Sequence, residues 1–316
     1  MGNKTISGKA PLRISFAGGG TDLNYIFEKY DGAVVNSTID KYCHMRITLR
    51  DDKQIFVNEV KLNPTEILAY KVIEYYKPEY GFELTYYNDI EPGSGLGSSS
   101  SFVILLLRLL NELDNKPIID SELVKDAYNI ETQIKEGGWQ DQYACSLGGF
   151  NFIEFYKNNT LVYPLRLKYS YICKLNEHFV LVEVNGKKND IHKKLREYSE
   201  KNIDELKRTS QIKDLAYKMR DCLLKSSTKG IDSILRTNWY LKRNKFTTNK
   251  QIDKLYELGL MNGATGGKIC GSGQCGHFLF YVEPEHKPML LKALKVKKYK
   301  IVDFNFGIHG VETWKD

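Results

Sequence analysis

The sequence predicts an α+β fold built as two lobes. Stretches with the alternating pattern of strands and stretches with helical spacing follow one another in mixed order, without the strict strand–helix alternation of a parallel sheet. With 316 residues and 42% hydrophobic content, the chain is long enough for two medium-sized cores. The pattern changes near the pair Gly148-Gly149, and the strand expected directly after this pair is assigned to the first lobe. We therefore expect one lobe at residues 1–155 and another at residues 156–316.

Strands in the first lobe are predicted by short runs in which apolar and polar residues alternate. The expected strands are residues 10–17, 32–39, 43–49, 55–57, 83–88 and 150–155. Helical spacing of apolar residues predicts helices at residues 63–76, 101–113 and 121–135. Gly137-Gly138 is expected to end the last of these helices.

The second lobe has a different pattern, with long polar amphipathic stretches between short strands. The expected strands are residues 160–165, 179–184, 278–282 and 300–304, and the expected helices are residues 191–219, 221–241, 247–258 and 284–294. Residues 263–276 are rich in glycine, and we expect them to form a turn that enters the strand at 278–282.

Composition narrows the function classes. The net charge of +7 suits an anionic partner, but the basic runs lack the interleaved aromatic residues of a nucleic-acid surface. The longest apolar run, near residues 102–110, is interrupted by Arg108 and is shorter than the roughly 18 to 20 residues of a membrane span. Six scattered cysteines form no C-x-x-C pair and no zinc spacing, so we expect reduced thiols. We predict a cytoplasmic protein that binds neither membranes nor nucleic acid. The oligomeric state is left open, with a homodimer among the options.

The stretch PGSGLGSSSS, residues 92–101, is the strongest functional signal. Glycines allow backbone N–H groups to approach phosphate oxygens, and the expected helix at 101–113 directs its N-terminal dipole to the same place. No lysine follows the last glycine, so this is not the G-x-x-x-x-G-K-[ST] loop. Serine hydroxyls here can bind phosphate or Mg²⁺. We predict a cradle for the phosphates of ATP, whereas a flexible turn is the alternative.

Two carboxylates in ETQIKEGGWQDQYA, residues 131–144, suit phosphoryl transfer. The reaction needs one carboxylate for Mg²⁺ and another to orient or deprotonate the attacking hydroxyl. Because Gly137-Gly138 lets the chain turn back, Glu131 and Asp141 can face one cleft. Taken alone this signal is weak, since acidic residues on helices are usually solvated.

A third group lies in KAPLRISFAGGGTDL, residues 9–23. Arg13 alternates with apolar residues on an expected strand, and a fixed guanidinium suits a moving phosphoryl group. Asp22 follows a glycine turn and can accept hydrogen bonds from sugar hydroxyls. The alternative for Asp22 is a helix cap or a first-turn acid.

Together with GGKICGSGQCGH, residues 266–277, these segments resemble the three motifs of the GHMP kinase superfamily, in order along nearly the whole chain. Within it, GGGTDL and GGWQDQYACSLGGFNFIEF, residues 18–23 and 137–155, are most similar to the D-glycero-D-manno-heptose 7-phosphate kinases. The resemblance implies a first lobe like domain 2 of ribosomal protein S5 and a ferredoxin-like second lobe. It also implies ATP-dependent phosphorylation of the anomeric hydroxyl of a sugar phosphate, giving heptose 1,7-bisphosphate on the route to a nucleotide-activated heptose.

The resemblance also implies residue roles. Asp141 would be the catalytic aspartate, Arg13 would stabilise the transferring phosphate, and Glu131 with Ser99 would bind Mg²⁺. The residues expected to bind ATP are Pro92, Gly93, Ser94, Gly95, Leu96, Gly97, Ser98, Ser99 and Ser100. The residues expected to bind the substrate are Gly19, Gly20, Thr21, Asp22, Gly138, Lys188 and Gly273.

This sequence departs from the subfamily pattern in two places. Gln274, Cys275 and His277 carry side chains where the third motif is close to GAGGGGF, and lysines occupy residues 187–188 where an arginine is usual. These departures bear on the identity of the sugar and not on the type of reaction. A kinase for another sugar, such as fucose or an unphosphorylated heptose, and a non-catalytic sugar or nucleotide sensor of the same fold remain as alternatives.

Overall fold

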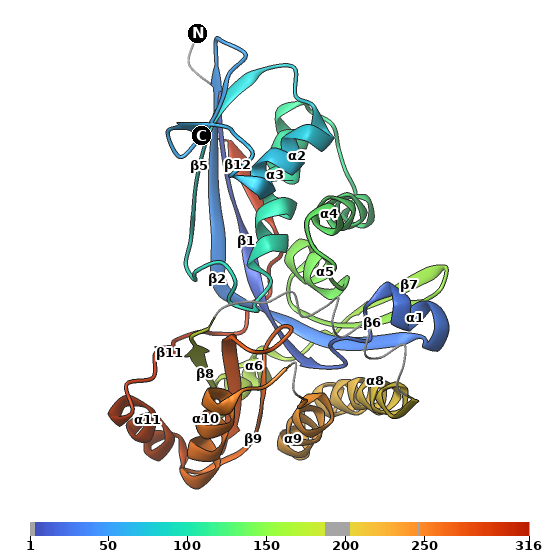
Figure 1. Ribbon diagram of the computed structural model, residues 1–316, viewed down its shortest axis with the longest axis vertical. Coiled ribbons are helices and arrows are strands. Elements are labelled where there is room, and N and C mark those ends of the chain that lie inside the picture. The colour runs from blue at the N-terminus through green and yellow to red at the C-terminus, as the bar shows by residue number, and fades with distance from the viewer. Residues whose placement is uncertain (1–3, 187–202, 245–246, 316) are drawn as a thin grey trace.

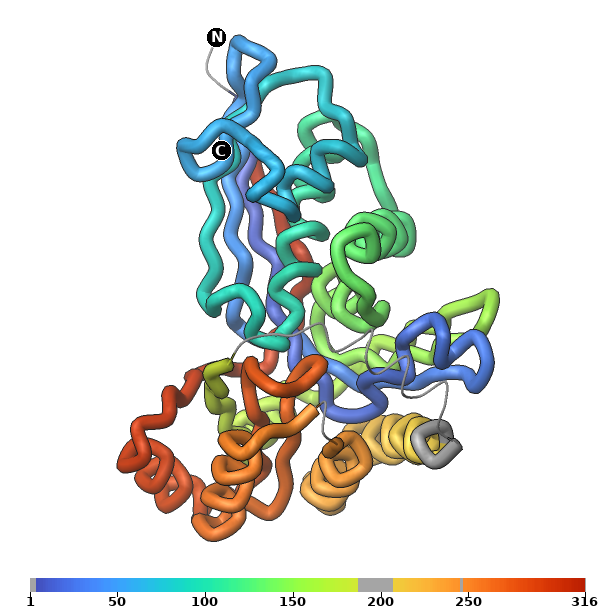
Figure 2. Tube along the Cα trace, viewed as in Figure 1, coloured from blue at the N-terminus to red at the C-terminus, as the bar shows by residue number. Residues whose placement is uncertain are grey.

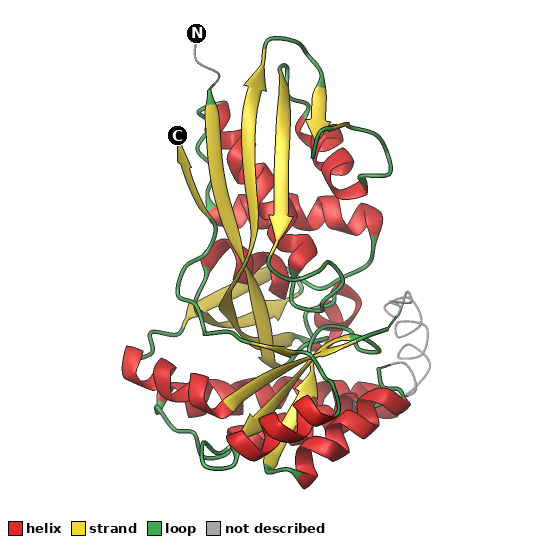
Figure 3. Ribbon diagram, turned by 90° about the vertical axis from the view of Figure 1, so that its left-hand side faces the viewer, coloured by secondary structure: helices red, strands yellow, loops and turns green. Residues whose placement is uncertain are grey.

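Two sheets organise the molecule, which is described by the computed structural model for residues 4–186, 203–244 and 247–315. Within these residues the larger sheet has eight strands, in the order β12-β1-β2-β5-β3-β4 with β6 and β7 added beside β2, and the smaller has four. Helices α2 to α5 lie along one side of the larger sheet (Figure 1). The two sheets approach each other in the middle of the molecule, with most helices on the outside (Figure 3).

The strands of the larger sheet are β1 (Thr5–Ala17), β2 (Gly32–Arg50), β3 (Ile55–Val57), β4 (Val60–Lys61), β5 (Gly81–Asn88), β6 (Phe150–Tyr156), β7 (Asn159–Pro164) and β12 (Glu312–Lys315). Those of the smaller sheet are β8 (Phe179–Val184), β9 (Ala264–Ile269), β10 (Gly276–Val282) and β11 (Ile301–Val302). The described helices are α1 (Asn24–Tyr30), α2 (Ile67–Tyr76), α3 (Ser98–Leu113), α4 (Asp120–Ile134), α5 (Gln140–Leu147), α6 (Tyr169–His178), α8 (Ile203–Leu224), α9 (Ile231–Lys242), α10 (Lys250–Met261) and α11 (Lys287–Val296). None of these helices combines the length and apolar character that a membrane span requires.

An irregularity in the pairing of β1 with β2 connects the sheet to the glycine loop. The antiparallel register shifts between Pro11 and Arg13 and again between Ser15 and Ala17. Such bulges redirect side chains and release backbone groups from the ladder. Here the backbone N–H of Arg13 donates to the carbonyl of Leu96 at 2.8 Å, so the strand is joined directly to the loop.

The smaller sheet has the topology expected of a ferredoxin-like lobe. Its order is β11-β8-β10-β9, and all of its strand pairs are antiparallel. Along the chain, helices separate β8 from β9, β9 runs directly into β10, and α11 precedes β11. The α+β two-lobed fold is therefore confirmed. The boundary at residue 155 stays a prediction, and the β6–β7 hairpin spans it.

A shared apolar core joins the lobes. Leu12, Ile14 and Phe16 of β1 pack in one cluster with Phe179 of β8 and Leu279 of β10. Separate clusters fill the space between the larger sheet and α3 and between the smaller sheet and α10. Because burial of apolar area is the main favourable term in folding, this contact fixes the lobes against each other.

Several helix predictions were wrong. A single helix at 221–241 does not form, because Gly230 takes φ 93° and separates α8 from α9. Three short helices were not predicted: α1, α5 and α6. The first part of the predicted helix at 191–219 lies outside the described residues, and the remainder belongs to α8.

Strand predictions also needed correction. Residues 32–39 and 43–49 form one strand, β2, because both halves find partners in the same sheet: β6 and then β5. The expected strand at 300–304 is confined to β11, and the chain then returns as β12 to pair with β1. The beginning of β1 and the end of β12 therefore lie side by side, far from the smaller sheet (Figure 2). Residues 264–269, predicted as a turn, form β9, in which Gly266 makes room for the carbonyl of Asp232.

Candidate active site

A cleft of about 400 Å³ lies where the lobes meet. It is lined by segments distant in sequence: the end of β1 with the following turn, the glycine loop, the α4–α5 connection, the end of α9, and the β9–β10 connection. Most residues that the sequence singled out lie on its walls. Lys188 lies outside the described residues.

The glycine loop forms the first wall of the cleft. Gly93, Gly95 and Gly97 have φ of 87°, 74° and 83°, in the left-handed region that only glycine adopts without strain. A Cβ on Gly95 would lie 2.6 Å from the carbonyl of Cys270, so this glycine is also required by close approach. The loop ends where α3 begins, and Ser98, Ser99 and Ser100 line the cleft at the helix N-terminus. Pro92, Ser94 and Leu96 are not among the lining residues.

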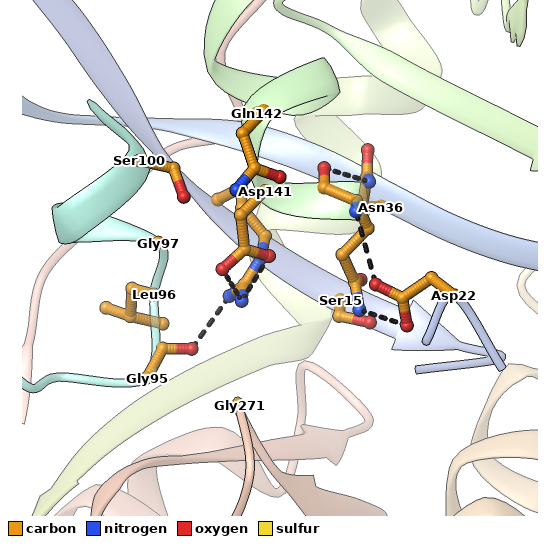
Figure 4. A network of polar contacts seen from close by, with 12 residues as sticks. Ser15, Asp22, Asn36, Gly95, Leu96, Gly97, Ser100, Asp141, Gln142 and Gly271 are labelled. Atoms are coloured by element: carbon orange, nitrogen blue, oxygen red, sulfur yellow. Dashed lines mark hydrogen bonds and ion pairs between the residues drawn. The ribbon is translucent and has the colours of Figure 1, made fainter. Parts of the chain in front are cut away.

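Arg13 and Asp141 form a two-point ion pair beside this loop (Figure 4). Nε of Arg13 donates to one carboxylate oxygen at 2.7 Å and a terminal nitrogen donates to the other at 2.8 Å. A third bond runs from Arg13 to the carbonyl of Gly95 at 2.7 Å. Burial opposes the charge of Arg13, but Asp141 outweighs that effect and raises its pKa. Arg13 is 3% exposed, so its position is set by the fold.

Glu131, near the end of α4, faces the same cleft. Its carboxylate accepts hydrogen bonds from Ser100 Oγ at 2.8 Å and from Gln142 Nε2 at 2.5 Å. Burial raises the pKa of Glu131, and hydrogen bonds from Ser99, Ser100 and Gln142 oppose that rise. Sequence reasoning missed Gln142, although it stands next to Asp141 in the quoted motif. It could have been found once α5 was expected, since Asp141 and Gln142 both lie in its first turn.

Asp22 lies on the opposite side of Asp141 from the glycine loop (Figure 4). Its carboxylate accepts from the backbone N–H groups of Gly20 at 2.9 Å and Gln140 at 3.2 Å. It makes no capping bond to α1, so the helix-cap alternative is excluded. A Cβ on Gly138 would lie 2.0 Å from this carboxylate, so a residue with a side chain would collide with Asp22 at this position. Burial raises the pKa of Asp22, and the nearby charge of Asp141 raises it further.

The other substrate residues expected from sequence are placed differently. Gly19 and Gly20 line the cleft. Thr21 is buried behind it, where its hydroxyl donates to the carbonyls of Gly18 and Ala33. Gly273 is not among the lining residues and packs against the backbone of Thr247.

Two lysines on the second lobe line the cleft and were not predicted. Lys242, the last residue of α9, donates to the carbonyl of Gly271 at 2.7 Å. Lys268, in β9, is 1% exposed and donates to the carbonyl of Ser15 at 2.5 Å. Burial lowers the pKa of both, that of Lys268 to about 7. The available signal was a lysine within an otherwise apolar and glycine-rich strand, ATGGKI.

The unusual third motif packs behind the glycine loop. His277 Nδ1 lies 2.9 Å from the carbonyl of Ser94, and a Cβ on Gly276 would come within 2.4 Å of the same oxygen. Gly271 and Ser272 line the cleft, whereas Gln274, Cys275 and His277 do not. The departure from the glycine-rich pattern therefore alters the support of the loop and leaves the cleft wall unobstructed.

Comparisons with known proteins agree with this geometry. The family GHMP kinases N terminal domain matches residues 67–149. The D-glycero-alpha-D-manno-heptose 7-phosphate kinase of Campylobacter jejuni is 34% identical, with 99% of each chain covered. The solved structure of a D-glycero-D-manno-heptose 1-phosphate kinase from Bacteroides thetaiotaomicron superposes with a TM-score of 0.82 at 29% identity, covering 98% of this chain and 99% of that one. Lactococcus lactis galactokinase shares the fold, with a TM-score of 0.75 at 18% identity over 99% and 95% of the two chains.

Proposed function

The chain belongs to the GHMP kinase family, and we propose that it transfers the γ-phosphoryl group of ATP to the anomeric hydroxyl of D-glycero-D-manno-heptose 7-phosphate. The product would be the 1,7-bisphosphate. The observation that carries the proposal is the Arg13–Asp141 pair held against a glycine loop at the start of α3. The choice of sugar rests on the full-length relative named for that substrate.

The proposed reaction is direct in-line transfer. A bond forms between the sugar oxygen and the γ-phosphorus while the bond to the β,γ-bridging oxygen breaks, and the hydroxyl proton passes to Asp141. In the loose transition state typical of this chemistry the proton moves late, so Asp141 acts first by orienting the hydroxyl. Because Arg13 binds both Asp141 oxygens, it fixes that orientation. Its guanidinium stabilises charge on the moving phosphoryl group.

The ATP phosphates would be bound by the glycine loop. The N–H groups of the first turn of α3 have no partner within the helix, and their dipole favours an anion. Gly93, Gly95 and Gly97, with Ser98 to Ser100, supply this wall. Ser94 and Leu96 support the loop from behind: the N–H of Leu96 donates to Ser94 Oγ at 3.3 Å.

The donors present at Glu131 fit a Mg²⁺ ion. Magnesium in kinases is commonly held by one or two carboxylates together with substrate phosphates. The carboxylate of Glu131 and the hydroxyls of Ser99 and Ser100 lie together at the loop. No cluster of three or more acidic, histidine or cysteine ligands occurs among the described residues, so the protein would hold the ion through Glu131 and serine, as expected for an ATP-bound metal. Bound there, Mg²⁺ would neutralise phosphate charge.

Product analysis tests the proposal. The protein is incubated with Mg-ATP and a panel of heptose 7-phosphate, unphosphorylated heptose, fucose and galactose, and products are identified by mass and phosphorus NMR. We expect a second phosphate on C1 of heptose 7-phosphate. If another sugar is turned over faster, that sugar replaces heptose 7-phosphate as the proposed substrate. If the protein binds ATP but turns over no sugar of the panel, it is a non-catalytic sensor.

A further inference from the structure

The charges on the second-lobe wall of the cleft are not balanced. Lys242 and Lys268 each donate to one backbone carbonyl, and neither makes an ion pair with a described residue. Four carboxylates line the cleft, and one of them, Glu136, lies in the α4–α5 connection of the first lobe. Asp141 is occupied at both oxygens by Arg13, and Glu131 is bound by Ser100 and Gln142.

Asp22 is the carboxylate whose charge acts most strongly on Lys242. Asp22 is already bound by two backbone N–H groups. The Cys270 thiol adjoins the lysines, but burial raises its pKa and keeps it neutral. A buried cation without an anion is unfavourable, and Lys268 is 1% exposed, so this wall is suited to a ligand that carries a negative charge.

A neutral group of the first lobe, the Ser15 side chain of β1, lies next to Lys268. Ser15 is 3% exposed, lines the cleft, and its hydroxyl has no hydrogen-bond partner among the described residues. A Cβ on Gly19 would lie 3.1 Å from that hydroxyl, so the glycine leaves it open. The hydroxyl is therefore available to a ligand beside the carbonyl that holds Lys268.

We propose that Lys242 and Lys268, with the hydroxyl of Ser15, bind the phosphate that the sugar substrate already carries. The inference rests on the proposed function and extends it, because it assigns the residues that select a sugar phosphate over a neutral sugar. The proposed function assigns the transferring phosphate to the glycine loop and Arg13, both in the first lobe. Lys242 reaches the cleft from α9 and Lys268 from β9, both in the second lobe.

The first test compares Lys242→Met and Lys268→Met with Lys254→Met, a matched loss of an exposed charge on α10. Steady-state kinetics are measured with heptose 7-phosphate and with the same heptose lacking phosphate. We expect KM for the sugar phosphate to rise roughly 10- to 100-fold in each cleft variant, the size of one lost charge-assisted bond. KM for ATP and the weak turnover of the neutral sugar should stay within about twofold of wild type. Equal losses with both sugars, or a matching rise in KM for ATP, would instead assign the lysines to the transferring phosphate and overturn the proposal.

The second test does not depend on the sugar. Binding of inorganic phosphate is measured by calorimetry on protein whose nucleotide site is filled with a non-hydrolysable ATP analogue and Mg²⁺. We expect one site in wild type and in Lys254→Met, weakened at least tenfold in both cleft variants, with unchanged circular dichroism. No binding to the loaded wild type overturns the inference. Phosphate binding without turnover of heptose 7-phosphate would retain the inference and reject the proposed function.

Discussion

The two walls of the cleft differ in how completely their charges are paired. On the first-lobe wall, Arg13, Asp141 and Glu131 are joined by hydrogen bonds to each other or to neighbouring side chains. On the second-lobe wall, Lys242 and Lys268 donate to backbone carbonyls, and the hydroxyl of Ser15, which comes from β1 next to Lys268, has no partner among the described residues. Each wall holds one almost fully buried cation, Arg13 at 3% exposure and Lys268 at 1%. The difference between the walls therefore lies in how these charges are paired.

This contrast separates two tasks. Phosphoryl transfer gains most from groups fixed before the substrate arrives, because no reorganisation is then needed at the moment of reaction. Selection of a charged substrate gains from groups whose pairing is left for that substrate to complete, since an analogue lacking the charge leaves them buried and unsatisfied. The pairing on the first wall suits catalysis of phosphoryl transfer, and the unpaired groups on the second wall suit selection of a charged substrate.

The largest effect is expected from breaking the paired wall at Asp141. Asp141→Asn keeps the shape of the side chain but cannot accept the hydroxyl proton and presents an amide nitrogen to Arg13. We expect kcat to fall about 10³- to 10⁴-fold, the scale of a general base together with lost orientation. Binding of ATP, measured by calorimetry, should stay near wild type because the glycine loop is untouched.

Asp303→Asn is the control, since it removes an exposed carboxylate outside the cleft. It should leave kcat unchanged. Turnover close to wild type in Asp141→Asn would show that the first wall does not act as the catalytic wall.

The next prediction concerns the contact between the two lobes at Gly95. Gly95→Ala would place a Cβ 2.6 Å from the carbonyl of Cys270, where the loop contacts the second lobe. Gly93→Ala is the matched comparison, because its φ is also positive at 87° but no atom lies within 4 Å of the added carbon. A left-handed conformation costs an L-residue about 1 to 2 kcal/mol, and both variants carry this. We expect KM for ATP to rise about tenfold further in Gly95→Ala, measured by steady-state kinetics. Equal effects would mean that the lobes separate freely at this contact.

The two walls also differ in how well their residues could be predicted from the sequence. Residues of the first wall were predicted because they lie in short segments with an evident chemical pattern: glycines before a helix, and acids around Gly137-Gly138. The strands β8 and β10 were also predicted, because their apolar runs are bounded by polar residues. A local pattern is enough where the function depends on local geometry.

The second wall was missed because lysine normally indicates a solvated surface. Nothing local reveals that Lys242 ends a helix facing the cleft, or that Lys268 meets Ser15 from another lobe, 253 residues away in sequence. α5 was missed for a related reason: Gly137-Gly138 is typical of a helix end, whereas the new helix begins two residues later at Gln140. Burial of a charged side chain is a property of the assembled fold.

The smallest expected effect is on stability, and it tests whether the second wall is unpaired. Burial in the folded chain lowers the pKa of Lys268 from its ordinary value of 10.5 to about 7. Between these values the unfolded chain binds more protons, so this group makes the stability of the wild type rise with pH. Charged groups facing Lys268 are Lys242 from α9 and Arg13 from β1. Lys268→Met removes the desolvated charge and also the hydrogen bond to Ser15.

We therefore expect Lys268→Met to be more stable than wild type by about 1 to 2 kcal/mol at pH 6, with the advantage shrinking toward pH 10. Denaturant unfolding at both pH values measures the difference, and titration of other groups cancels between the two proteins. A variant that is less stable than wild type at pH 6 would show that the lysine is already compensated without a ligand. A more stable variant with weaker binding of the sugar phosphate would show that the second wall gives up stability for selection.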